Sequence, residues 1–238
     1  MTQPTAQPTA PRRPRALTAV LVTVIALGLL VAGGGLAVAA GIGRSDTPTA
    51  DSVDAGFSRD MSRHHLQAVE MANLALTRSS DDEVRQLAFD ISATQTNQAG
   101  RMQGWLALWG LPATSSEVMG WMDDGAMAGH DMGGMSGAAG HGVDPAAAAD
   151  GAVMPGMATE TELTELRGLS GQAFDVLFLQ LMTRHHQGGL EMAEYGEDHA
   201  SEPAVASLAR SIAQSQTAET TTMEQMLRAR GGAPLPAP

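Results

Sequence analysis

The pattern of apolar and polar positions divides the chain into one continuous apolar segment and a longer part with helical periodicity. Residues 16–42 carry no charge, and a stretch of about 20 apolar residues is enough to span a bilayer. From residue 54 to residue 230, apolar residues recur at spacings of three and four, the period of an amphipathic α-helix. No part of the sequence shows the alternation that is typical of β-strands. The pattern predicts an all-α protein with one N-terminal hydrophobic helix.

Residues 16–42 are interpreted as a transmembrane anchor or as a signal peptide. Arg12, Arg13 and Arg15 precede the apolar segment, and positive charge favours the cytoplasmic side of a membrane. An anchor makes residues 1–15 a cytoplasmic tail, residues 43–53 a linker, and the rest the extracytoplasmic domain of a single-pass protein of the cell membrane. A signal peptide, cleaved at the small residues "AVA" of positions 37–39, gives a secreted or periplasmic protein. Both interpretations export the chain after residue 44.

Two stretches of the periodic part repeat each other. "FSRDMSRHHLQAVEMA" begins at Phe57, and "FLQLMTRHHQGGLEMA" begins at Phe178, which is 121 residues later. Identical residues continue at this offset without a gap as far as Leu106 and Leu227. Such self-similarity at one fixed offset indicates an internal repeat.

Each repeat is predicted to fold as two helices joined by a short turn. In repeat one, residues 54–110, the first helix covers about residues 54–77, and "SDDE" at residues 80–83 has the sequence of a capping box that starts the second. In repeat two, residues 171–230, the helices cover about residues 171–197 and 201–230, and two glycines then end the last helix. Two helical hairpins of this kind form a four-helix bundle, which we expect to cover residues 54–230.

The segment between the repeats differs in composition. Residues 113–158 are rich in methionine, glycine and alanine and also contain two histidines. This low complexity predicts a Met/Gly/His-rich flexible loop. Residues 159–171 then predict a short helix and a break before the second repeat.

Charge and composition narrow the functions that suit the exported part. From Arg44 onward there are 11 arginines, no lysine and all 26 acidic residues, which gives a net charge of −15. This charge argues against binding to nucleic acid or to an anionic membrane surface. The chain has no cysteine, which excludes disulfides and thiolate metal sites. It has 15 methionines against eight aromatic residues, and methionine serves both as a core residue and as a soft thioether ligand.

The repeated His-His motifs place imidazole and thioether groups on one face of a helix. Met61 lies one turn before His64 and His65, and Met71 lies two turns after His64. Imidazole binds copper readily and thioethers favour soft ions such as Cu(I), whereas calcium and magnesium prefer oxygen ligands. The eight candidate metal ligands are His64, His65, Met61, Met71, His185, His186, Met182 and Met192.

Seven further residues are additional candidate ligands. They are Met102 and Met223, on the inner stripes of the second helix of each hairpin, and Met127, His130, Met132, Met135 and His141, in the loop. A flexible loop with these side chains suits weak and labile binding of a soft cation. The sequence leaves open which histidine of each pair binds, and whether the two halves share one central ion or hold separate ions.

A packed core explains part of the same pattern. A methionine stripe is more often core than ligand, and a single buried histidine is more often a hydrogen-bonded core residue. A core does not explain adjacent histidine pairs placed twice among thioethers, or a loop rich in the same residue types. Glu70 and Glu191 lie away from the histidines around the helix, so we expect them on a solvated surface. Arg63 and Arg184 are expected to pair with acidic neighbours such as Asp60 and are assigned no chemistry.

The motif resembles a known bacterial family. The pattern D-x-x-F-x-x-x-M-x-R-H-H-x-x-x-x-E-M-A, followed by a helix with I-x-x-x-Q, is similar to the family called "domain of unknown function 305". The resemblance extends from about Asp54 to Leu227 and includes "PGMATETELTEL" before the second motif. The family includes exported copper-resistance proteins of the CopM type. The resemblance implies a ferritin-like four-helix bundle that binds copper or silver outside the cytoplasm through the histidine pairs and motif methionines.

Two departures separate the halves of the chain. Gln98 stands where Glu219 stands in the other half, so the two sites need not be equivalent. Gly188 and Gly189 lie inside the second motif helix, where each glycine costs about 1 kcal/mol relative to alanine. Close helix packing or a local kink would explain them.

The sequence supports three functions. The first is non-enzymatic sequestration or transfer of Cu(I) in copper tolerance. The second is a ferritin-like metal oxidase; di-iron bundles use a Glu-x-x-His motif that the predicted helices lack, which leaves a cuprous oxidase as the enzymatic alternative. The third is a structural or interaction module with packed histidines, whose stability a metal would leave unchanged.

Overall fold

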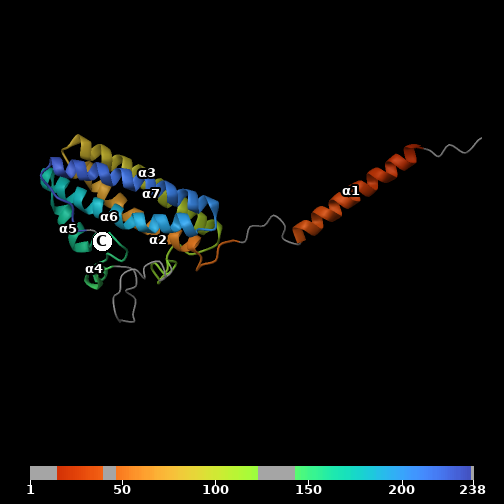
Figure 1. The fold of residues 1–238 in the computed structure, drawn as a ribbon, viewed down its shortest axis with the longest axis horizontal. Coiled ribbons are helices and arrows are strands. Elements are labelled where there is room, and N and C mark those ends of the chain that lie inside the picture. Colours follow the sequence, from red (N-terminus) through yellow and green to blue (C-terminus); the bar gives the residue numbers. More distant parts are fainter. Residues whose placement is uncertain (1–14, 40–46, 123–142, 237–238) are drawn as a thin grey trace, which may run out of the picture. The chain divides into compact units, whose positions relative to one another are not determined.

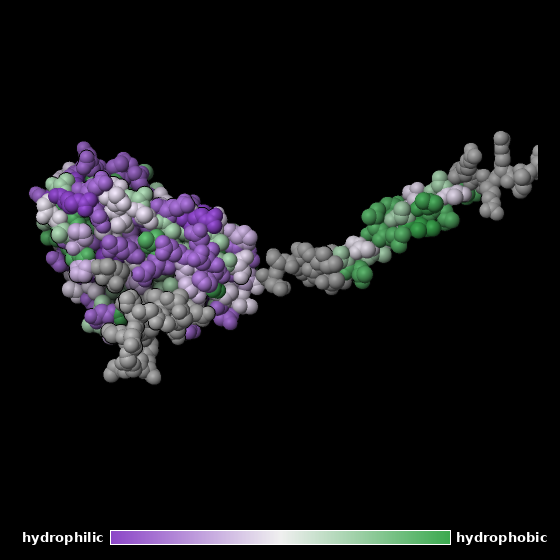
Figure 2. All heavy atoms as spheres, viewed as in Figure 1, coloured by the Kyte–Doolittle hydropathy of each residue, from purple (hydrophilic) through white to green (hydrophobic). Residues whose placement is uncertain are grey.

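A computed structural model describes residues 15–39, 47–122 and 143–236 of the chain. The chain divides into two units, Met1–Thr47 and Pro48–Pro238. The first contains helix α1 (Arg15–Ala39), whose segment Leu17–Ala37 has a mean hydropathy of 2.4 and is long and apolar enough to cross a membrane. Its large apolar side chains are exposed, whereas hydrophilic residues cover most of the visible face of the second unit (Figure 2). Helix α1 therefore has the properties of a membrane anchor or of a signal sequence.

Four long helices of the second unit form a bundle (Figure 1). Helices α2 (Val53–Arg78) and α3 (Asp82–Leu108) pack as one hairpin, and α6 (Gly171–His199) and α7 (Pro203–Ala229) pack as the other. The hairpins meet principally through α2 and α6, which run antiparallel, so that the start of α2 lies beside the end of α6. The described ranges contain no strand. The predicted all-α bundle of two hairpins, preceded by one apolar helix, is confirmed.

The turn inside the first hairpin differs by one residue from its prediction. The side chain of Asp81 accepts hydrogen bonds from the backbone N–H groups of Glu83 (3.0 Å) and Val84 (3.4 Å) at the start of α3. Asp81 is thus the N-cap, and the capping box predicted from Ser80 to Glu83 is wrong. A carboxylate suits this position because it also interacts favourably with the positive end of the helix dipole.

Helix α7 has no side-chain cap of its own at Glu202. Asp54, in the first turn of α2, instead accepts hydrogen bonds from the backbone N–H groups of Ser201 (3.2 Å) and Glu202 (2.8 Å). The start of one hairpin therefore satisfies free N–H groups at the turn of the other.

Buried apolar side chains form two clusters, and each cluster takes residues from all four long helices. One cluster includes Met71, Phe174, Phe178, Met182 and Met223; the other includes Phe57, Met61, Met102, Met192 and Ile212. Because α2 and α6 contribute to both clusters, neither hairpin buries its apolar face alone.

The segment after α3 packs on the bundle, which corrects the prediction of a flexible loop at that end. Asp60 of α2 accepts hydrogen bonds from the backbone N–H of Met119 (2.7 Å) and from Nε1–H of Trp121 (2.9 Å). The Trp121 ring lies edge-on to Phe57, with ring centroids 5.8 Å apart. Burial raises the pKa of Asp60 above its ordinary value even though these hydrogen bonds act in the opposite direction.

The other end of the segment is also folded. It contains the short helix α4 (Pro145–Ala149) and the helix α5 (Glu160–Gly168), which confirms the short helix predicted there. Thr159 and Glu162 form a capping box at the start of α5. Glu162 also binds the guanidinium group of Arg184, at 2.6 and 2.9 Å, so this arginine pairs with an acidic residue other than Asp60.

Candidate metal centre

The four histidines of the repeated motifs lie in the middle of α2 and α6 and are fully buried. Where the two helices cross, the rings of His64 and His185 contact each other, with centroids 3.7 Å apart and planes inclined by 34°. His65 and His186 instead bond to the second helix of their own hairpins. The structure thus distinguishes an inner pair, His64 and His185, from an outer pair, a distinction that two adjacent sequence positions do not reveal.

Backbone hydrogen bonds fix the tautomers of the inner pair. His64 Nε2 lies 3.1 Å from the carbonyl oxygen of Pro155, and His185 Nε2 lies 3.1 Å from the carbonyl oxygen of His64. A carbonyl oxygen only accepts, so each Nε2 carries the proton and each Nδ1 keeps a bare lone pair. Both Nδ1 atoms are buried without a hydrogen-bond partner. A neutral imidazole with one free nitrogen is the form in which histidine binds a metal.

The outer pair donates to side chains across each hairpin. His65 Nε2 lies 2.8 Å from Oε1 of Gln98 on α3, and His186 Nε2 lies 2.7 Å from Oε2 of Glu219 on α7. Both acceptors are oxygens, so these histidines also carry the proton on Nε2. Their Nδ1 atoms are likewise buried and unpartnered. Histidines that bind metals usually donate their other ring N–H to a carboxylate or carbonyl in this way.

Burial keeps the imidazoles of His64, His65 and His185 neutral. Removal from water lowers the pKa of His64 to about 4 and that of His65 to about 3, and it lowers the pKa of His185 well below its ordinary value. Neighbouring imidazoles act in the same direction, because a positive charge on one ring would repel a positive charge on the next. Near neutral pH, protons therefore do not compete for the Nδ1 lone pairs of these three side chains.

The six candidate methionines of the helices are all fully buried, but their grouping differs from the predicted one. The sequence groups the two methionines of each motif with the histidines of the same helix. In the structure, each group combines methionines of both hairpins, and the groups lie on opposite sides of the histidines. The groups are Met61, Met102 and Met192 on one side and Met71, Met182 and Met223 on the other. The antiparallel crossing causes this, since a residue before the histidines on α2 meets a residue after them on α6.

The remaining candidate ligands are the five residues of the loop. The loop residues Met127, His130, Met132, Met135 and His141 lie outside the described residues. Within the described ranges, no group of three or more His, Asp or Glu side chains is arranged to hold a metal ion. Both motif glutamates, Glu70 and Glu191, are exposed, as expected.

The two glycines of the second motif are explained by close packing. A Cβ on Gly188 would lie 2.2 Å from the carbonyl oxygen of Pro155, and a Cβ on Gly189 would lie 2.8 Å from Oε1 of Gln216. The contact at Gly188 is with backbone, so only glycine lets the turn at Pro155 approach α6 this closely, whereas a Cβ at position 189 would make the end of the Gln216 side chain shift. Of the two explanations offered by the sequence, close packing is the one observed.

Three residues of the centre were missed among the candidates. The carbonyl oxygen of Pro155 accepts a hydrogen bond from His64 Nε2. Gln216 has both amide atoms buried without a partner, and Gln95 has its Oε1 atom in the same condition. Gln95 and Gln216 occupy equivalent positions of the two repeats, 121 residues apart. This repetition is the sequence feature from which they could have been identified. With neutral imidazole nitrogen, thioether sulfur and amide oxygen, the centre offers lone pairs but little negative charge. This donor set suits a soft cation of low charge and not calcium or magnesium.

Several solved structures share this fold. A DUF305 protein from Streptomyces coelicolor is 41% identical to the chain, with a TM-score of 0.65, and the match covers 79% of this chain and 99% of that one. A DUF305 fragment from Deinococcus radiodurans is 32% identical, with a TM-score of 0.57, over 74% of this chain and 96% of the fragment. CopM in its Cu(I)-bound form is 25% identical, with a TM-score of 0.52, over 75% of this chain and 98% of its own.

The family match covers the whole bundle. No curated protein matches the chain. The family model described as Domain of unknown function (DUF305) matches residues 54–227, which include both His-His motifs and the segment between them. The chain therefore belongs to the DUF305 family.

Proposed function

We propose that this protein binds Cu(I) outside the cytoplasm and sequesters or transfers it without catalytic turnover. The proposed ligands are drawn from the four motif histidines and the motif methionines Met61, Met71, Met182 and Met192. One observation carries the proposal: His64 and His185 contact each other in the core, and both present an Nδ1 lone pair that no protein group satisfies.

An unsatisfied buried polar atom destabilises a fold by about 1–3 kcal/mol. Four imidazole Nδ1 atoms of α2 and α6 share this condition, and so do the amide oxygens of Gln95 on α3 and Gln216 on α7. A bound cation would satisfy several of these acceptors at once. Each of the four histidines already donates one hydrogen bond from Nε2. These bonds fix the rings in the core but leave the Nδ1 atoms unused.

The choice of Cu(I) rests on the thioethers that flank the histidines. Sulfur of methionine is a soft ligand that favours Cu(I), and neutral imidazole accepts copper as well. The 25% identical structure of CopM in a Cu(I)-bound form supports the same metal. Because each methionine group combines both hairpins and the inner rings touch, we place the copper in a centre that the two halves share.

The proposed location is the outer side of the cell membrane, with α1 as the anchor. The arginines before α1 support this orientation. The Streptomyces coelicolor relative is described as a candidate secreted protein, which supports export of the bundle. Intact-mass measurement of the protein from its native membrane separates an anchor from a signal peptide, because cleavage near residue 39 removes the apolar segment.

The experiment is an anaerobic titration of the full chain, in mild detergent, against a chromophoric Cu(I) chelator. The test variant is H64Q/H185Q, which keeps a polar side chain in the core, and the control is H199Q, because His199 is exposed near the end of α6. We expect wild type and control to hold Cu(I) and the test variant to lose affinity by about 100-fold or more. Equal titration of a helical test variant and wild type would show that the histidines are packing residues. Catalytic oxygen consumption with Cu(I) would instead indicate an oxidase.

A further inference from the structure

Met154, Pro155, Gly156 and Met157 form a tight turn beside the histidine centre. The backbone N–H of Met157 donates to the carbonyl oxygen of Met154 at 3.2 Å, and Gly156 has a φ of +75°. Proline at the second position and a glycine with positive φ at the third are characteristic of a type II turn. Such a turn brings the Cα atoms of its first and fourth residues within about 7 Å, so the two methionines lie close together.

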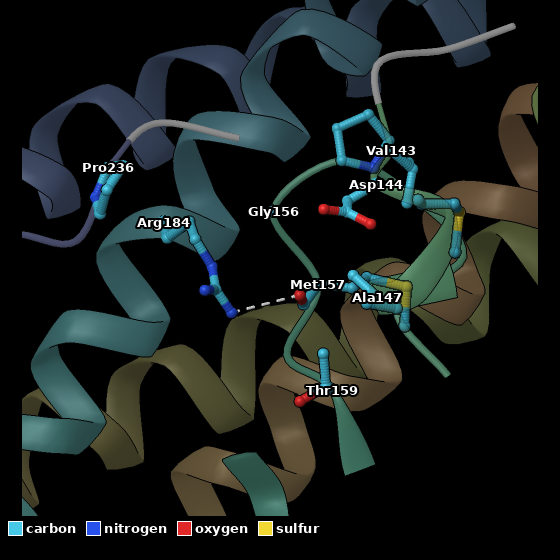
Figure 3. A pocket seen from close by; sticks show the side chains of 11 residues that line it. Val143, Asp144, Ala147, Gly156, Met157, Thr159, Arg184 and Pro236 are labelled. Atoms are coloured by element: carbon cyan, nitrogen blue, oxygen red, sulfur yellow. Dashed lines mark hydrogen bonds between the residues drawn. The ribbon is translucent and has the colours of Figure 1, made fainter. Parts of the chain in front are cut away.

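The outer side of the turn faces a cavity. The cavity has a volume of about 290 Å³ and is lined by both methionines of the turn, by Asp144, and by Arg184 of α6 (Figure 3). The guanidinium group of Arg184 is already paired, because its Nη1 and Nη2 atoms donate to the carboxylate of Glu162 and Nη2 also donates to the carbonyl oxygen of Met157 at 3.3 Å. The cavity therefore combines two thioethers and the carboxylate of Asp144 with a guanidinium group whose charge Glu162 already pairs.

The inner side of the same turn contacts the histidine centre. The carbonyl oxygen of Pro155 accepts the proton of His64 Nε2, and the Pro155–Gly156 peptide lies directly on Gly188 of α6. A Cβ on Gly156 would lie 2.4 Å from the carbonyl oxygen of Arg184. Backbone packs on backbone here, and the turn meets His64 at the Nε2 edge of its ring.

The turn is docked where the two halves of the bundle differ. Gly188 corresponds in the repeat to Gln67, whose side-chain amide donates to the carbonyl oxygen of Ala158 (2.9 Å) and accepts from its N–H (2.7 Å). Gly188 makes room for the turn, and Gln67 holds Ala158, the residue that follows the turn. The inner histidines differ accordingly: His185 donates to the backbone of α2, whereas His64 donates to the turn.

We propose that Met154 and Met157 form a loading site for a soft monovalent cation, through which the ion reaches His64. The proposal rests on the proposed function, because it supplies a route to that centre. All four histidines are fully buried, so an ion cannot reach them without passing a covering element. The turn is a non-helical element that contacts an inner histidine and also lines a cavity.

The transfer is a ligand exchange. The ion leaves a neutral thioether lone pair and binds the bare Nδ1 lone pair of His64. Its oxidation state stays the same, and no proton moves, because the proton of His64 is on Nε2. Two thioethers hold a soft cation reversibly, which suits a step that must release it.

The test compares M154L/M157L with M119L/M122L in the full chain in mild detergent. Leucine conserves the volume of methionine and removes the thioether sulfur. Met119 and Met122 are buried in the same cluster but do not line the cavity. The rate of Cu(I) uptake from a chromophoric chelator is measured anaerobically by stopped flow. We expect uptake by M154L/M157L to slow by about tenfold or more with less than about a threefold change in equilibrium affinity, and the control to behave as wild type.

Unchanged uptake by M154L/M157L, with wild-type affinity, would overturn the loading site and leave the proposed function intact. Loss of Cu(I) retention by the wild type itself would overturn the proposed function. A second measurement does not depend on the rate of uptake or on binding by the inner histidines. It is methionine-methyl NMR of H64Q/H185Q with added Ag(I). The methyl signals of Met154 and Met157 are expected to shift while those of Met119 and Met122 stay in place, and absence of any shift of the first two would refute the site.

Discussion

His186 donates from Nε2 to a carboxylate oxygen of Glu219 at 2.7 Å, whereas its counterpart His65 donates to the amide oxygen of Gln98 at 2.8 Å. The geometry is the same on both sides of the bundle, and only the charge of the acceptor differs. A carboxylate acceptor makes the imidazole a stronger metal ligand than a neutral amide does. We therefore expect E219Q to weaken Cu(I) binding by about 10- to 100-fold in the chelator titration.

The chain supplies its own control for this change. Q98E gives His65 the acceptor that His186 has, and the double variant Q98E/E219Q exchanges the two acceptors. If the carboxylate acts through its histidine, Q98E strengthens Cu(I) binding and the double variant restores it toward the wild-type value. Equal affinities in all four proteins would show that the acceptors only position the rings.

Two glycine substitutions are expected to have opposite effects on stability, because Gly188 lies at the contact between α6 and the turn and Gly100 lies in open space. G188A places a Cβ against the carbonyl group of Pro155, and we expect it to lower the free energy of unfolding by about 2 kcal/mol. G100A adds a Cβ to α3 where nothing lies within 4 Å, and it should stabilise the protein by up to about 1 kcal/mol. Urea unfolding followed by circular dichroism measures both, and stabilisation by G188A would contradict the packing described.

The buried histidines make stability depend on pH. The pKa of His64 falls from 6.5 in the unfolded chain to about 4 in the fold, so its neutral form stabilises the fold fully above pH 6.5. Stability is lost as the pH falls toward 4, because the unfolded chain binds the proton first. We expect a loss on the order of 2 kcal/mol per such histidine at pH 5, measured by urea unfolding between pH 7 and 4.5. The folded H64Q/H185Q variant should lose less over the same range, and a flat profile for the wild type would contradict the burial of neutral imidazoles.

The cap that α2 provides for α7 can be tested by a single substitution. D54A removes both acceptors for the N–H groups of Ser201 and Glu202, and we expect it to cost about 1–2 kcal/mol in unfolding free energy. D51A is the matched control, because Asp51 is exposed just before α2. Thermal unfolding of the two variants gives the comparison, and equal midpoints would show that solvent replaces the cap.

The helices could be predicted from the sequence because their period is a local property. Apolar spacings of three and four place Met61 and His64 on one face whatever the rest of the chain does. The partner of that face is a non-local property, and here the antiparallel crossing pairs Met61 with Met192 and separates it from Met71. The repeated motif groups the four histidines in the sequence, but their inner and outer positions depend on which helix each ring meets.

The segment between the hairpins shows the opposite case. Its low complexity hides contacts that only the folded bundle provides, such as the hydrogen bonds of Met119 and Trp121 to Asp60. The carbonyl oxygen of Pro155 is a backbone atom and carries no sequence signature as a histidine partner. The glycines opposite this turn were the one indication that something approaches α6 there.

Each methionine group takes residues from both hairpins, and this affects how formation of the centre depends on protein concentration. A separate hairpin would hold only one or two of the three methionines of each group, and two such molecules would have to associate before a centre existed. Covalent connection turns that encounter into an intramolecular one with a high effective concentration. The centre of this chain therefore forms at any protein concentration, and dilution alone cannot take it apart.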